Sequence, residues 1–181
     1  MPRADAVRNR NRLLEAAATV FAAGGDPTLD QVARDAGVGI GTLYRHFPTR
    51  EALVEAVYRA ELTAVCAGVD DLLATHADAA TALRAWLDRY AEFTATKRGM
   101  ADTFRAMVAD GTVVRAQTRE AVDAAVATFL RAGAEDGSLR AGIEPDDVVT
   151  LMVGLFVAVG DLGDRARIAR LLDLLVCAAR S

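Results

Sequence analysis

GVGIGTLYRHF, residues 37–47, decides the expected fold of this chain. Three glycines fall within its first five residues, and three large polar-tipped side chains follow together. A few residues earlier, Thr28 to Gln31 has the capping-box pattern, in which the threonine hydroxyl accepts from the amide three residues on and the glutamine side chain reaches back. The pattern predicts a short helix from about Thr28 to Gly37, a residue that takes left-handed backbone without steric penalty. Its expected inward residues are Leu29, Val32, Ala33 and Ala36.

A second short helix is predicted from Ile40 to about Phe47. Ile40, Leu43 and Phe47 are spaced by three and four residues, which places them on one inward side. Pro48 ends this helix, because the residue before a proline is pushed out of helical geometry. Two short helices joined by a glycine-containing turn of about three residues make a helix-turn-helix.

The rest of the chain is also predicted to be helical. Apolar residues recur at helical spacing, and no alternating runs are bounded by Asn-Gly or Asp-Gly turns. The expected helices cover about 6–23, 50–73, 79–96, 100–110, 112–134, 145–160 and 165–179. We therefore expect an all-α protein of about nine helices, with a three-helix helix-turn-helix domain at 1–50 and a larger helical domain at 51–181.

The distribution of charge favours a nucleic-acid partner, although the net charge of −4 alone argues against one. The first 60 residues carry eight arginines and seven acidic residues. Four of these arginines fall within residues 3–12 beside a single aspartate, and residues 37–50 contain two arginines and no acid. For the first group two interpretations stay open: a solvated, frayed end, or a basic arm that follows the minor groove.

Several other functions are disfavoured. The longest uncharged run near the end, residues 148–160, is shorter than the roughly 20 residues of a membrane span. The first residues lack the apolar stretch of a secretory signal, so we expect a cytoplasmic protein. Two distant cysteines and two histidines indicate no metal site. The segment GIGTLY, residues 39–44, has no preceding strand and lacks the third glycine of a nucleotide loop, and no catalytic motif appears. We expect no enzymatic activity and no cofactor.

The second helix of a helix-turn-helix enters the major groove, while neighbouring groups hold phosphates. Glycines would let the backbone approach DNA closely, hydroxyl and imidazole groups offer neutral hydrogen bonds, and arginines offer charged ones. Amides at the start of the first helix add an anion contact. The predicted DNA contacts are Thr28, Gly39, Ile40, Gly41, Thr42, Tyr44, Arg45, His46 and Arg50.

Residues 10–58 resemble the N-terminal domain of the TetR family of transcriptional regulators, through LLEAAATVFAAGG and TLDQVARDAGVGIGTLYRHFPTREALVEAVY. The resemblance implies a homodimer on an inverted-repeat operator, usually a repressor, released when a small molecule enters the C-terminal domain. It places Thr42, Tyr44 and His46 on recognition-helix contacts and Arg50 on a phosphate contact. Gly39 departs from the family, where many relatives have a capping serine. The C-terminal part is similar to the SbtR-like subgroup.

Two sets of residues are predicted in the C-terminal part. The last two helices are apolar on more than one face, which favours a four-helix seam with a second copy. This predicted dimer set is Val148, Met152, Leu155, Phe156, Val159, Ile168, Leu171, Leu172 and Leu175. Large apolar side chains with few polar groups form the predicted ligand set: Trp86, Tyr90, Phe93, Met100, Phe104, Met107, Met152 and Phe156. As plain core is the more common role of such residues, that alternative stays open.

A second class of function also remains open. The chain would then be a helical dimer that binds an apolar metabolite, with a helix-turn-helix that is vestigial or contacts a protein. The salt dependence of the affinity for duplex DNA distinguishes the two classes, because phosphate contacts weaken as the salt concentration rises.

Overall fold

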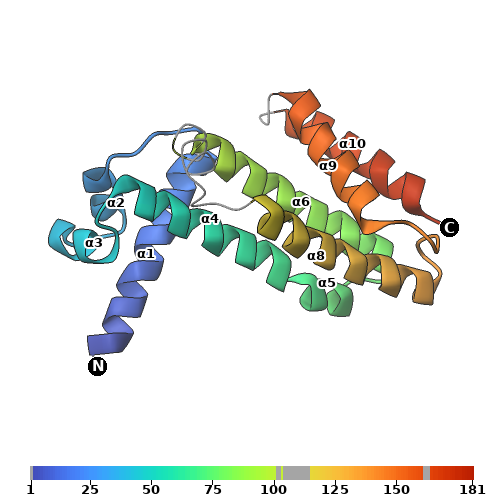
Figure 1. The fold of residues 1–181 in the computed structure, drawn as a ribbon, viewed down its shortest axis with the longest axis horizontal. Coiled ribbons are helices and arrows are strands. Elements are labelled where there is room, and N and C mark those ends of the chain that lie inside the picture. Colours follow the sequence, from blue (N-terminus) through green and yellow to red (C-terminus); the bar gives the residue numbers. More distant parts are fainter. Residues whose placement is uncertain (1, 101–102, 104–114, 161–163) are drawn as a thin grey trace. The chain divides into compact units, whose positions relative to one another are not determined.

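The structure, a computed structural model, describes residues 2–100, 103, 115–160 and 164–181. These residues form helices and no β-strand, apart from an isolated bridge between Leu139 and Arg180. The predicted all-α class is confirmed. The helices are α1 (Pro2–Ala22), α2 (Leu29–Asp35), α3 (Ile40–His46), α4 (Arg50–Ala67), α5 (Val69–Thr75), α6 (Ala79–Gly99), α8 (Arg115–Asp136), α9 (Pro145–Val159) and α10 (Arg165–Ala179) (Figure 1).

The chain divides into two compact units. The first comprises Met1–Leu62 and Phe93–Val114, and the second comprises Thr63–Glu92 and Arg115–Ser181. Helices α4 and α6 each run from one unit into the other. The last turns of α6 therefore belong to the same unit as the helix-turn-helix.

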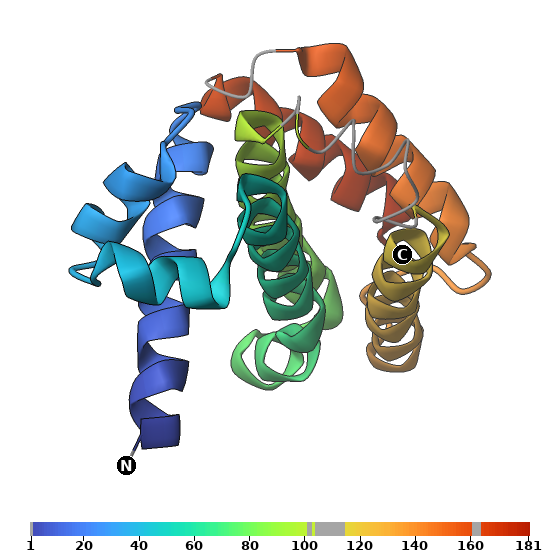
Figure 2. The same ribbon diagram turned by 60° about the vertical axis from the view of Figure 1, so that its left-hand side comes forward.

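In the first unit, α1 contacts both α2 and α3, and α2 contacts α3 (Figures 1 and 2). Apolar side chains from all three helices and from α4 meet between them, with Leu13, Phe21, Val32, Leu43 and Leu53 almost fully buried. The end of α6 packs on the backbone of α1, where the carbonyl oxygen of Phe21 occupies the space that a β-carbon on Gly99 would need. Glycine at this position permits the close approach of the two helices.

In the second unit, α9 contacts both α8 and α10, and α5 contacts α8. The core is built around Trp86, whose ring lies 5.9 Å from that of Phe129 and whose indole nitrogen donates to the carbonyl of Val65 at 3.0 Å. This hydrogen bond satisfies the one polar group of a fully buried side chain.

Four predicted helices differ from their expected bounds or extend beyond the described residues. Helix α1 begins at Pro2 rather than near Ala6, since proline suits the first helical position. The predicted continuation of the fourth helix to Leu73 is wrong, because the chain leaves α4 at Ala67 and Gly68 precedes a separate α5. The predicted helix at 100–110 lies almost entirely outside the described residues, as do 112–114 of the next one.

Candidate nucleic-acid interface

Local contacts close α2 at both ends. Thr28 caps α2, its hydroxyl accepting from the amide of Gln31 at 3.2 Å as predicted. The predicted return contact is wrong, because the Gln31 side-chain amide donates instead to Asp35 at 2.6 Å. At the other end Gly37 has a φ of +60°, in the left-handed region that favours glycine. Its amide donates to the carbonyl of Arg34 at 3.0 Å, so the sequence closes α2 locally.

Helix α3 has a buried side and an exposed side. Leu43 is fully buried and Phe47 almost so. On the other side Tyr44 is 49% exposed and Arg45 is exposed, while Thr42 is half-buried. The guanidinium of Arg45 donates to the Thr42 hydroxyl at 2.8 Å. Polar groups thus lie together on the outer side of α3.

Ile40 was expected to face inward in the core of the helix-turn-helix, and that expectation is wrong. Its side chain is 38% exposed. Leu43 and Phe47 already fill the side of α3 that packs against the rest of the unit, and Ile40, as the first residue of a seven-residue helix, is not covered. The same exposure leaves Ile40 on the outer surface together with Tyr44.

Gly39 and Gly41 are not required by anything within the described protomer. Neither has a positive φ, and a β-carbon on either would meet no atom within 4 Å. Both are exposed. Within a helix glycine costs up to about 1 kcal/mol relative to alanine, so Gly41, the second residue of α3, carries a cost that no contact inside the described protomer offsets. Gly39 also caps α3 without a side-chain hydrogen bond.

Arg50, the first residue of α4, holds the loop between α1 and α2. Its guanidinium donates to the carbonyl of Pro27 at 2.6 Å, pairs with Asp26, and lies 5.6 Å from the ring centroid of Phe21. Sequence reasoning did not find Asp26 or Pro27, because they precede Arg50 by more than twenty residues. Thr49 caps the same helix, its hydroxyl accepting from the amide of Ala52 at 3.2 Å.

The remaining predicted DNA contacts lie at the edges of the helix-turn-helix. His46 is half-buried at the end of α3, with its ring 6.2 Å from that of Phe47. Thr28 is exposed at the start of α2, on the loop that Arg50 holds.

The predicted ligand set is divided between the two units. Trp86, Tyr90, Met152 and Phe156 are buried in the second unit, where Tyr90 lies 5.5 Å from Trp86 and 5.9 Å from Phe156 between ring centroids. Phe93 and Met100 are buried in the first unit. Phe104 and Met107 lie outside the described residues.

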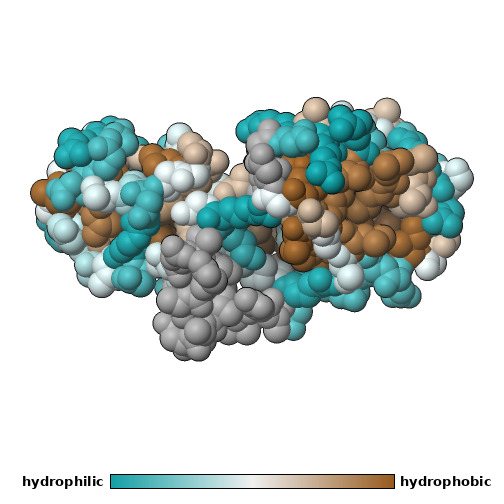
Figure 3. Space-filling view, turned by 90° about the horizontal axis from the view of Figure 1, so that it is seen from above, coloured by the Kyte–Doolittle hydropathy of each residue, from teal (hydrophilic) through white to brown (hydrophobic). Residues whose placement is uncertain are grey.

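Most of the predicted dimer set is buried inside the protomer. Leu155, Leu171 and Leu175 are half-buried, and the other six are buried: Val148, Met152, Phe156, Val159, Ile168 and Leu172. Other apolar side chains of the same helices are exposed, namely Leu151 at 65%, Val157 at 73% and Leu174 at 65%. Figure 3 shows hydrophobic side chains gathered on the face that α9 and α10 form.

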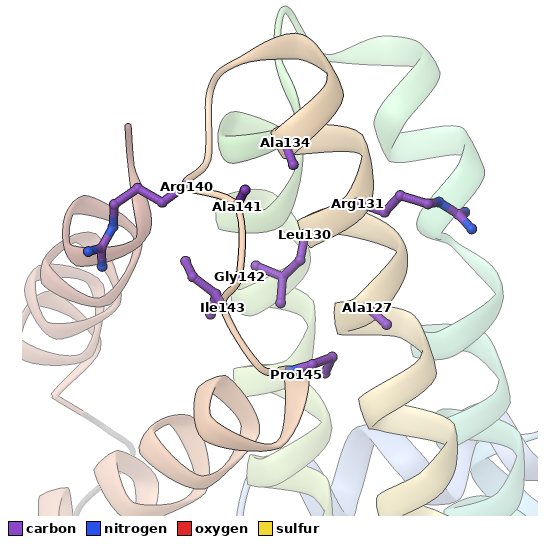
Figure 4. A pocket seen from close by; sticks show the side chains of 9 residues that line it. All are labelled: Ala127, Leu130, Arg131, Ala134, Arg140, Ala141, Gly142, Ile143 and Pro145. Atoms are coloured by element: carbon purple, nitrogen blue, oxygen red, sulfur yellow. The ribbon is translucent and has the colours of Figure 1, made fainter.

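One cavity of about 230 Å³ lies between α8 and the loop that leads to α9. Its lining is mainly apolar and includes Leu130, Ile143 and Pro145, and none of the six described members of the predicted ligand set contributes to it. The charged ends of Arg131 and Arg140 point away from it (Figure 4). The guanidinium of Arg140 donates instead to the carbonyl of Ala178.

Over the described ranges, no helix is long and apolar enough to cross a membrane. Within the same ranges no group of three or more histidine, cysteine or acidic side chains is arranged to hold a metal ion.

The described part of the chain is helical, and α3, the second helix of its helix-turn-helix, is exposed along a polar side. These features are those of the helix-turn-helix DNA-binding proteins. A sequence model of the bacterial regulatory proteins of the tetR family matches residues 13–57. A model of the C-terminal domain of SbtR-like transcriptional regulators matches residues 78–177. The chain belongs to the TetR family, and it is a transcriptional regulator with a DNA-binding helix-turn-helix.

Solved structures of the family are similar over almost the whole chain. A TetR transcriptional regulator from Streptomyces coelicolor is 41% identical, with 94% of this chain and 98% of that one covered and a TM-score of 0.85. A TetR transcription regulatory protein from Mycobacterium vanbaalenii is 30% identical over the full length of both, with a TM-score of 0.78. The HTH-type transcriptional regulator TtgW of Pseudomonas putida is 46% identical over 56 residues, which span 30% of this chain and 42% of that protein.

Proposed function

We propose that this regulator binds an inverted-repeat operator as a homodimer, represses transcription there, and releases the DNA when an apolar small molecule binds. Residues 1–50 would bind DNA, and residues 51–181 would bind the effector and the second copy. As its partner would be the bacterial chromosome, we place the protein in the cytoplasm.

The proposal rests mainly on the exposed side of α3, where glycines leave the backbone uncovered by side chains at two positions near its start. Gly39 and Gly41 have ordinary backbone angles and open space around them, so nothing in the described protomer requires glycine at either position. The helix-propensity cost of Gly41 within α3 would be offset if another molecule comes close. Tyr44 and Arg45, on the same short helix, supply hydrogen-bond donors beside that space. A helix whose first turn has few side chains and is followed by hydrogen-bond donors fits the major groove, where backbone and side chains contact base edges and phosphates.

Each predicted contact has a proposed role. Gly39, Ile40 and Gly41 let the start of α3 approach the bases, with Ile40 offering an apolar contact to a thymine methyl. Thr42 and Arg45 are hydrogen-bonded to each other and would read or hold DNA as a pair. Tyr44, His46 and the amides at Thr28 would bind phosphates. We propose that Arg50 acts largely by holding Asp26 and Pro27, since its guanidinium is already engaged there.

Selection of genomic fragments tests the function directly. Purified protein is incubated with sheared genomic DNA, bound fragments are sequenced, and the affinity for the recovered site is measured over a series of salt concentrations. We expect an inverted repeat and an affinity that falls steeply with salt, because each phosphate contact releases counterions. Absent or salt-insensitive binding would instead favour a metabolite-binding protein whose helix-turn-helix is vestigial or contacts a protein.

Tyr44→Ala tests α3 as the contact surface. The loss of about 1 kcal/mol of hydrogen bonding in each subunit predicts roughly thirtyfold weaker binding of the dimer, with folding unchanged because the ring is half exposed. Tyr44→Phe is the matched control that removes only the hydroxyl, and it should reproduce most of the loss. Fluorescence anisotropy near physiological salt measures both, and parental affinity for Tyr44→Ala would contradict the role.

The dimer is proposed to form through the exposed face of α9 and α10. Leu151, Val157 and Leu174 lie on it, and exposed apolar patches of this kind mark interaction sites. Leu155, Leu171 and Leu175 of the predicted dimer set are half-buried, and their exposed parts would add to the contact with the second copy. A second copy fits because an isologous contact uses one patch on both subunits, and an inverted-repeat operator needs the same two-fold symmetry.

Gly154 supports close packing of this face. It sits in the middle of α9 without a positive φ, and a β-carbon there would meet no atom within 4 Å. As with Gly41, nothing in the described protomer requires glycine. A bare backbone between Leu151 and Val157 would let a helix of the second copy cross closely.

The effector site is proposed among the aromatic and methionine side chains of the second unit. Tyr90, Met152 and Phe156 join α6 to α9 there, with Tyr90 and Phe156 in ring contact, so a ligand that separates them would move α9 against α6. Apolar compounds should therefore release bound operator DNA. Release is measured by anisotropy, with direct binding to DNA-free protein by calorimetry as the check.

A further inference from the structure

The first turns of α1 form a basic segment that precedes the residues matched by the sequence model of the family's N-terminal domain. The match begins at residue 13, whereas α1 begins at Pro2. We call residues 2–12 the N-terminal extension. It contains four arginines and one acidic residue, Asp5, in a chain whose net charge is −4. As the extension is helical, it is not the extended arm that enters a minor groove.

Two arginines of the extension reach the two ends of α3. A guanidinium nitrogen of Arg12 lies 2.7 Å from the place of a β-carbon on Gly37, in the turn before α3. The guanidinium of Arg10 lies 5.6 Å from the ring centroid of Phe47, directly after α3. Phe47 is buried, so this contact fixes Arg10 against the core. The extension is therefore held beside the recognition helix by its own cations.

These cations remain available to a partner. Arg10 and Arg12 are exposed, and neither forms an ion pair in the described part of the chain. Arg8 pairs with Asp5 three residues earlier, and both side chains are exposed. An exposed pair of this kind contributes little and exchanges readily for a stronger partner.

We infer that the N-terminal extension binds the phosphates of the duplex that α3 reads, through Arg10 and Arg12, with Arg8 strengthening the contact. The inference rests on the proposed DNA binding. A helix in the major groove has a phosphate strand on each side, and the two arginines stand at the two ends of that helix. Guanidinium groups suit phosphate oxygens, and the contact would add affinity without reading sequence.

The test compares the full-length protein with Arg10→Gln/Arg12→Gln on the selected operator and on an unrelated duplex. The slope of log affinity against log salt should fall by about 0.9 for each phosphate that an arginine no longer neutralises. Affinity should fall by the same factor on both duplexes, because phosphates carry no sequence. Arg10→Lys/Arg12→Lys should keep most of the slope, and Asp5→Asn should raise affinity, since it removes the acid that competes for Arg8.

Arg165→Gln/Arg167→Gln is the matched control. It removes two exposed arginines at the same spacing from α10, in the second unit, and changes net charge equally. We expect little effect on its salt slope. An equal loss in this control, an unchanged slope in Arg10→Gln/Arg12→Gln, or a loss confined to the operator would each overturn the inference.

Two readouts keep the outcomes separate. If the parent protein shows no salt-dependent binding to duplex DNA, the proposed function fails; if the parent binds and the extension variants bind equally, only this inference fails. Thermal unfolding checks that the glutamine pair still folds. Should it not fold, Arg8→Gln, whose one ion-pair partner in the described residues is Asp5, must show the lower slope by itself.

Discussion

Gly37 and Gly41 stand four residues apart, and glycine occupies the two positions for different physical reasons. Gly37 has a φ of +60°, and Arg12 fills the space beside it, so the fold itself requires glycine. Gly41 has neither constraint. Substitution at the first glycine therefore tests the turn, and substitution at the second tests the surface.

Gly37→Ala should destabilise the protein by about 1–2 kcal/mol, the cost of a left-handed backbone angle for a residue with a β-carbon. A further loss is expected because the methyl group displaces Arg12. Gly24→Ala is the matched control, since Gly24 has a φ of +75° with nothing within 4 Å. Urea unfolding measures both, and a smaller effect at Gly37 than at Gly24 would contradict the role of Arg12.

Residues whose environment is set by near neighbours were predictable from the sequence. Leu43 and Phe47 follow from helical spacing, and Gly37 follows from the end of an apolar stripe. The exposure of Ile40 was not predictable, because periodicity does not tell how far the core extends along a seven-residue helix. The partners of Arg50 are equally hidden, since chain reversal after α1 brings Asp26 and Pro27 to it.

At the scale of elements, the start of α6 is closed by the last residue of α8, Asp136, and by Ser138 just after it. The amide of Ala79 donates to Asp136 at 2.8 Å, and the amide of Ala80 donates to the Ser138 hydroxyl at 3.1 Å. A hydrogen bond from the Ser138 hydroxyl, followed by backbone amides of Ala79 and Ser138, lowers the pKa of Asp136 below its ordinary value. The second unit thus joins two distant segments by a shared cap.

Asp136→Ala should lower the free energy of unfolding by about 1 kcal/mol near neutral pH, as expected for the loss of a cap. A carboxylate whose folded pKa is lowered stabilises the fold above its unfolded pKa of about 3.9 and loses this effect as the pH falls through the folded pKa. The difference from the parent should therefore shrink below about pH 4. Glu135→Ala, an adjacent exposed acid, is the control, and an equal effect there would contradict the cap.

The break between α4 and α5 shows a limit of sequence reasoning at this scale. Isolated glycine is tolerated within helices, so Gly68 alone did not predict an end. In the structure a nitrogen of Arg89 lies 2.6 Å from the place of its β-carbon, which means that a side chain of α6 fills the corner. The end of α4 is therefore marked by a tertiary contact, which the local periodicity of the sequence does not reveal.

At the scale of the whole molecule, the question is which side of α9 and α10 meets the second copy. The sequence predicts that both helices are apolar on more than one side, but it does not say which side the protomer itself buries. Leu172 is fully buried, so a charge there would test folding rather than assembly. The exposed Leu151, Val157 and Leu174 are the better probes.

Val157→Glu should convert the proposed dimer to a folded monomer, because two glutamates would meet without water or counterions across a two-fold axis. Operator affinity should fall at least tenfold, since a single half-site makes about half of the contacts. Ala124→Glu, on the exposed side of α8, is the control. Sedimentation measures the mass of each, and a dimeric Val157→Glu would contradict the proposed face.

Gly41→Ala tests the central claim most directly, because the claim predicts opposite changes in two properties. Open space around Gly41 means that alanine should raise the free energy of unfolding, by up to about 1 kcal/mol, while its methyl group should weaken operator binding. Both are measured on one preparation, by urea unfolding and by anisotropy near physiological salt. A more stable protein with weaker operator binding is the predicted result, and a more stable protein that binds its operator as tightly as the parent would contradict the assignment of α3 to the groove.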